Sequence, residues 1–130
     1  MKKNLSLFLG LIILFTSCKS KIKYSDFNES DFYEVQGIIN YANPSNNPFD
    51  VSIVKNIGYS YFLDRPIHLK GEEKNIEMFE PKKGYPLIVL VHKDNENISF
   101  YGRVGILKTL NNKEKEFLKK HIQDEIKKIE

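Results

Sequence analysis

The chain has 130 residues, with 20 Lys and Arg against 17 Asp and Glu, three His and a single Cys. One cysteine excludes a disulfide within the chain, and the length suits one domain with its own hydrophobic core. The formal net charge of +3 is too small for the electrostatic footprint of nucleic-acid binding, so we expect no nucleic-acid partner.

The first residues have the layout of an export signal. Lys2 and Lys3 precede an eleven-residue apolar run, residues 5–15, with the sequence LSLFLGLIILF. A membrane-spanning helix needs about 20 apolar residues because the hydrocarbon core is ~30 Å thick, so this run is too short to cross. We therefore expect residues 1–17 to be a signal peptide. Its removal takes away Lys2 and Lys3 and leaves 18 basic residues against 17 acidic ones.

The only cysteine, Cys18, directly follows Thr16 and Ser17 at the end of the apolar run. Two small residues before a cysteine at this place resemble the lipobox of bacterial lipoproteins. The resemblance covers residues 1–18. It implies that the Cys18 thiol receives a diacylglycerol, that cleavage makes Cys18 the new N-terminus, and that its amine is acylated, for example with palmitate. The alternatives are an ordinary signal peptide in which Cys18 has no role, and a buried N-terminal helix.

Residues 18–30 are expected to be the lipidated cysteine and a polar tether, because they are charged and contain few apolar side chains. Lys19, Lys21 and Lys23 either favour anionic head groups or belong to a solvated linker. In lipoprotein families an aspartate after the cysteine often marks inner-membrane retention, and here Lys19 stands in its place. The resemblance therefore implies attachment to the outer membrane with the protein facing the periplasm.

Residues 31–130 are expected to form a single globular domain that begins with two strands. Residues 32–42 and 51–63 alternate in apolar character with period two, which is typical of strands with one buried face. A turn-rich stretch, NPSNNP, separates them. Residues 67–69 fit a short return strand, and residues 70–84 fit either a helical turn or a further strand.

The second half of the domain predicts a hairpin followed by a helix. Residues 85–92, YPLIVLVH, are apolar on both faces, which favours a central strand. Residues 98–106 predict the returning strand, with a bend or bulge at Gly102 and Gly105. Asn111 and Glu114 begin a helix with a capping box. The apolar stripe of this helix comprises Phe117, Leu118, Ile122, Ile126 and Ile129.

Together these elements predict an α+β fold. The strands should form a small, mostly antiparallel curled sheet or a partly open barrel of four to five strands, and the C-terminal amphipathic helix should dock on it because an isolated helix of this length is marginal.

The residues that usually carry chemistry are scattered. His68, His92 and His121 lie in three separate elements without metal-ligand spacing, so we expect no metal site and no cofactor. The stretch around Ser60 lacks the second glycine of a nucleophile elbow. Glutamates 72, 73, 77 and 80 are interpreted as solvated. We assign no catalytic residue and do not expect an enzyme.

Aromatic and arginine side chains are the better candidates for a partner-binding surface, because these types anchor protein interfaces. Tyr101 and Arg103 are expected on the face opposite Phe100 and Val104, and so to be exposed. The alternative is that most of the rings belong to the core. The full candidate set is Tyr59, Tyr61, Arg65, Tyr101 and Arg103.

The sequence thus predicts a lipid-anchored cell-envelope protein that acts as a non-enzymatic binding or assembly module for an envelope partner. Its contact with the membrane is the N-terminal lipid on Cys18. Two alternatives are a small periplasmic hydrolase that uses His92 or His68, and an inhibitor or immunity-type lipoprotein. The hydrolase requires a histidine and an acidic side chain to converge in one pocket.

Overall fold

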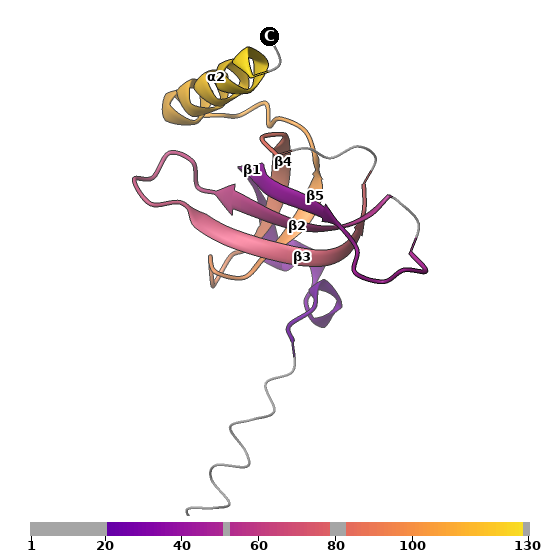
Figure 1. Cartoon of the computed structure of the whole chain (residues 1–130). Coiled ribbons are helices and arrows are strands. Elements are labelled where there is room, and N and C mark those ends of the chain that lie inside the picture. Colours follow the sequence, from indigo (N-terminus) through magenta and orange to yellow (C-terminus); the bar gives the residue numbers. More distant parts are fainter. Residues whose placement is uncertain (1–20, 51–52, 79–82, 129–130) are drawn as a thin grey trace, which may run out of the picture.

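The expected α+β fold is confirmed: five antiparallel strands curl into a half-barrel, and a helix follows them (Figure 1). A computed structural model describes residues 21–50, 53–78 and 83–128. Leu69–Glu77 is a strand, which decides between the two alternatives for residues 70–77, while residues 79–82 lie outside the described residues. The elements are η1 (Tyr24–Asp26), η2 (Glu29–Asp31), β1 (Phe32–Pro44), β2 (Val54–Tyr61), β3 (Leu69–Glu77), β4 (Pro86–His92), β5 (Ser99–Val104) and α2 (Asn112–Lys127).

The strands lie in the order β3-β2-β1-β4-β5, and each pairs antiparallel with its neighbours. Because β4 lies beside β1, the first four strands have Greek-key topology. The outer strands β3 and β5 approach each other, because the Glu73 side chain on β3 bonds to the backbone of Tyr101 on β5. The result is a five-stranded, partly open barrel, the architecture that OB folds also have. This architecture by itself assigns no function.

The barrel interior is filled by alternate residues of the inner strands, as the period-two pattern predicts. On β1 the inward residues are Val35 and Ile39, and on β4 they include Leu87 and Val89. The outward Ile88 of β4 is also buried, at 2% exposed, which confirms the central-strand assignment. The interior cluster comprises Val35, Ile39, Ile57, Tyr59, Tyr61, Phe62, Met78, Leu87, Val89 and Val91.

A bulge in β5 changes which side chains face inward. Val89 pairs with Tyr101 and Ile88 pairs with Arg103, so Gly102 is the extra residue. Directly opposed residues of an antiparallel pair share a face. Tyr101 therefore faces the interior with Val89, and Arg103 faces outward with Ile88. The bulge predicted at Gly102 is confirmed, but the prediction that Tyr101 and Arg103 share an exposed face is wrong.

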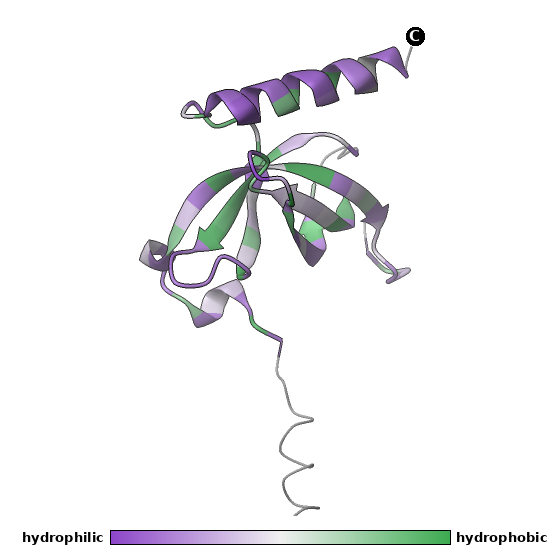
Figure 2. Cartoon of the chain, turned by 90° about the vertical axis from the view of Figure 1, so that its left-hand side faces the viewer, coloured by the Kyte–Doolittle hydropathy of each residue, from purple (hydrophilic) through white to green (hydrophobic). Residues whose placement is uncertain are grey.

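Helix α2 lies across one end of the barrel and is hydrophilic over most of its surface (Figure 2). Leu118 packs on Ile38 and Leu63, which buries Ile38 although the alternation of β1 places it on the polar face. The predicted capping box is present: the Asn111 N–H donates to the Glu114 carboxylate at 3.0 Å, and the Glu114 N–H donates to Asn111 Oδ1 at 2.9 Å.

The N-terminal segment is attached to the barrel by aromatic side chains. The Phe27 ring lies 5.6 Å from the Phe32 ring and 5.1 Å from the His92 ring. Tyr24 contacts Phe32 at 5.2 Å and Phe100 at 5.6 Å between ring centroids. The tether predicted to continue through residue 30 is therefore shorter in the structure, because residues 24 and 27 bury aromatic surface within an otherwise polar run.

Candidate functional site

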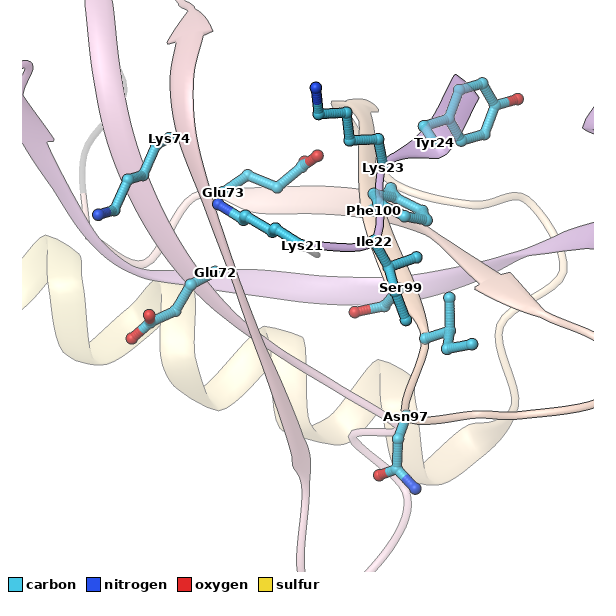
Figure 3. Close-up of a pocket in the computed structure, with 11 residues that line it drawn as sticks. Lys21, Ile22, Lys23, Tyr24, Glu72, Glu73, Lys74, Asn97, Ser99 and Phe100 are labelled. Atoms are coloured by element: carbon cyan, nitrogen blue, oxygen red, sulfur yellow. The ribbon is translucent and has the colours of Figure 1, made fainter. Parts of the chain in front are cut away.

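A pocket of about 350 Å³ opens at the seam where β3 and β5 approach each other. Three segments line it: residues 21–24, residues 72–74 of β3, and residues 97–100 at the start of β5. Figure 3 shows Glu73 reaching from β3 toward the segment that carries Lys21 and Lys23. We call this the seam pocket. Its position is set by the incomplete closure of the barrel.

Glu73 is the half-buried carboxylate of the seam pocket. Its Oε2 accepts a hydrogen bond from the Tyr101 N–H at 2.5 Å. Burial raises the pKa of the Glu73 carboxyl, while the Tyr101 N–H and the charge of Lys21 oppose the rise. In the described part of the chain, ion pairs join Arg65 to Glu96 and Arg103 to Glu34, and none joins Glu73 to a lysine.

Two tyrosine hydroxyls reach the seam from inside the barrel. Tyr59 and Tyr61 have no exposed surface, yet the Tyr59 hydroxyl lies 3.0 Å from Ser99 Oγ, and the Tyr61 hydroxyl donates to the Glu96 carbonyl at 2.7 Å. Gly71 allows this approach, since a Cβ there would lie 2.5 Å from the Tyr59 ring. Burial raises the pKa of Tyr59, so it remains a neutral hydroxyl. These two rings belong to the core and not to a partner surface.

The other three predicted partner-binding residues are divided between the two sides of the sheet. Tyr101 is half-buried and packs against the interior cluster. Arg103 is exposed, and its guanidinium forms a bidentate ion pair with the Glu34 carboxylate. Arg65 pairs with the Glu96 carboxylate and places its guanidinium carbon 3.7 Å from the centre of the Phe62 ring.

A second cavity, of about 300 Å³, brings the two arginines close to one surface. Arg65 lines it directly, and Arg103 holds Glu34, which also lines it. The exposed ring of Tyr33 lies at the same cavity. We call this the β1 cavity. Its lining residues are Tyr33, Glu34, Val35, Gln36, Phe62, Asp64, Arg65, Leu107, Thr109 and Glu114.

The histidines do not converge on either cavity. The rings of His68 and His121 both contact the Phe117 ring, at 5.0 and 6.0 Å between ring centroids. His92 packs on the rings of Phe27 and Phe32, and its Nδ1 accepts a hydrogen bond from the Asp94 N–H at 3.1 Å. Within the described residues, no group of three or more His, Cys, Asp or Glu side chains could hold a metal ion.

The composition of the seam pocket suits binding better than bond cleavage. The Ser99 hydroxyl is hydrogen-bonded to the Tyr59 hydroxyl, and within the described residues no hydrogen bond joins it to a histidine or carboxylate that could act as the general base of a serine nucleophile. Three lysines and two glutamates at the pocket offer charges of both signs. Sequence reasoning missed this site because it placed Glu73 in a solvated loop. The usable signal was the alternation of Leu69, Gly71 and Glu73 along one strand.

Comparison of the chain with protein-family models, curated proteins and solved structures finds no match. Among the described residues, no helix is long and apolar enough to span a membrane.

Proposed function

We propose that this chain is a lipid-anchored protein of the bacterial cell envelope that acts as a non-enzymatic binding or assembly module. Cys18 carries the lipid, and the barrel presents a surface to an envelope partner. The expected location is the outer membrane, with the barrel in the periplasm.

The observation that carries this proposal is the short link between Cys18 and the barrel. Lys21 already lines the seam pocket and lies only three residues after Cys18. Three residues span at most ~10 Å. A lipid on Cys18 would therefore hold the seam end of the barrel at the membrane. Helix α2 lies at the opposite end of the barrel from η1 (Figure 1).

The β1 cavity is the best candidate for the partner surface. Tyrosine and arginine dominate the residues that contribute most to protein–protein binding, and this cavity combines Tyr33 and Arg65 with the nearby Arg103. The arginine side chains are 43% and 57% exposed. Exposed ion pairs contribute little to folding stability, so both arginines are available for a partner without a large effect on the fold.

Two experiments test this proposal, one for the lipid anchor and one for the partner surface. Labelling with a fatty-acid analogue should mark the wild-type chain and not Cys18→Ala, and equal labelling of both would contradict the lipid anchor.

In membranes, a photo-crosslinking residue at position 33 should capture one discrete partner. Arg65→Ala combined with Arg103→Ala should weaken that capture about thirtyfold, corresponding to ~2 kcal/mol for interface anchors. The matched control is Lys113→Ala with Lys119→Ala on α2. Unchanged capture by the arginine variant would contradict this surface.

A further inference from the structure

The rim of the seam pocket combines exposed apolar and basic side chains. Ile22 is 53% exposed and Tyr24 is 39% exposed, and Lys21 and Lys23 alternate with them as exposed residues. Aliphatic, tyrosine and lysine side chains together are typical of surfaces in the head-group layer of a bilayer, where rings and stems sit among the lipids and ammonium groups meet phosphates.

The same rim is close to the proposed lipid and is held firmly on the barrel. Lys21 is three residues from Cys18, a reach of ~10 Å at most. From Tyr24 onward the chain is packed on the barrel through the rings of Phe32 and Phe100. Little free chain separates an acylated Cys18 from the docked segment, so the barrel can adopt few orientations relative to the membrane. In these orientations the rim of the seam pocket faces the bilayer.

The interior of the seam pocket offers a carboxylate without a cationic partner. One oxygen of Glu73 binds the Tyr101 N–H, and Glu73 has no lysine within ion-pair distance although three lysines line the same pocket. Ser99 and Asn97 add polar atoms. A ligand that fits this pattern carries an ammonium group for the carboxylate and a phosphate for the lysines. The volume of about 350 Å³ lies at the lower end of small-molecule sites.

We propose that the rim of the seam pocket rests on the bilayer surface and that the pocket takes the ammonium–phosphate headgroup of a lipid. The ammonium binds Glu73, and the phosphate binds Lys21 and Lys23 at the rim. This inference rests on the proposed lipid anchor at Cys18. It gives the barrel a fixed orientation, with α2 pointing away from the membrane.

The orientation is tested on the full acylated chain in lipid nanodiscs. Acylation consumes the only thiol, so Ile22→Cys and Ile122→Cys each provide one site for a fluorescent label. Ile122 lies on α2 and is 37% exposed. Lipids with a quencher on the headgroup should quench the label at position 22 at least threefold more than the label at position 122. Equal quenching with Cys18 acylated would overturn this inference alone, whereas an unacylated Cys18 in mass spectra would overturn the proposed function as well.

The headgroup is tested by hydrogen exchange in two kinds of nanodisc. Both contain the same fraction of phosphatidylglycerol, and the main lipid is phosphatidylethanolamine in one and phosphatidylcholine, whose nitrogen is fully methylated, in the other. Amides of residues 72–74 and 97–100 should exchange about tenfold more slowly with phosphatidylethanolamine. Glu73→Gln, which keeps an acceptor for the Tyr101 N–H, should abolish the difference, and the exposed Glu77→Gln should not. The same exchange rates in both lipids would overturn the headgroup assignment.

Discussion

The Glu73 carboxylate on β3 accepts a hydrogen bond from the backbone N–H of Tyr101 on β5, at 2.5 Å. These two strands make no backbone pairing with each other in the described residues, so a side chain takes the place of a ladder hydrogen bond. Exposed Lys70, Glu72 and Lys74 alternate along the same edge of β3. Charged side chains on an edge strand disfavour pairing with another chain. The edge of β3 is therefore protected from aggregation although it is not paired with β5.

Glu73→Gln is expected to stabilise the unliganded protein at neutral pH. Burial raises the pKa of the Glu73 carboxyl above its ordinary value of 4.5. The folded state thus holds this proton more tightly than the unfolded state, and stability falls as the pH rises from the unfolded to the folded pKa. Glutamine avoids this loss and still accepts from Tyr101. Melting temperatures should favour the variant at pH 7 and converge below about pH 4. A wild type that is more stable at pH 7 would contradict the desolvation argument. Glu77→Gln is the exposed control.

The aromatic contacts of the N-terminal segment predict a measurable contribution to stability. Phe27→Ala should lower the free energy of unfolding by about 1–2 kcal/mol, because aromatic pairs contribute ~0.5–1.5 kcal/mol beyond the area they bury. Phe49 is the matched control, since it is 92% exposed and the same substitution there removes little packing. Denaturant titrations of both variants compare the two effects. A loss at Phe27 no larger than at Phe49 would mean that residues 24–30 are only a tether.

Much of the fold could be predicted from the sequence because strands alternate inward and outward with period two. That pattern located β1, β2, β4 and β5, and the apolar character of β4 on both faces predicted its central place. A period-two pattern in the sequence cannot predict side-chain directions beyond a β-bulge, however. One extra residue at Gly102 moves every later side chain to the other face, so Tyr101 and Arg103 were placed on the same side in error.

The candidate site was much harder to predict because it depends on contacts between distant segments. Composition described residues 18–30 as polar, and it did not show that Tyr24 and Phe27 find partners on β1 and β5. Glu73 was interpreted as solvated, because only the curling of the sheet brings β3 near β5. Arg65 and Arg103 are held by the carboxylates of Glu96 and Glu34, which lie 31 and 69 positions away in the chain, and of these four residues Arg65 and Glu34 line the β1 cavity.

Gln36 is expected to be essential for the attachment of the segment after β5. Its side chain has no exposed surface. The amide nitrogen donates to the carbonyls of Leu87 and Gly105, both at 3.1 Å, and Oε1 accepts from the Leu107 N–H at 2.8 Å. Gln36→Leu has a similar size and leaves these groups unpaired, so it should cost about 2–4 kcal/mol. Thermal unfolding beside Gln123→Leu, an exposed change on α2, measures the effect. An equal, small change in both variants would refute this role for Gln36.

Substitution of Tyr101 should affect mainly folding stability, and substitution of Arg103 should affect mainly partner binding, although the two residues are only two positions apart. Tyr101→Ala removes a half-buried ring that packs on the interior cluster, so it should lower the free energy of unfolding by about 1–3 kcal/mol. Arg103→Ala removes an exposed side chain whose ion pair with Glu34 is open to water, so melting should be nearly unchanged. Crosslinking from position 33 should show the converse, with Arg103→Ala weakening partner capture. A destabilised Arg103→Ala beside a stable Tyr101→Ala would contradict the inward position of Tyr101 and the outward position of Arg103.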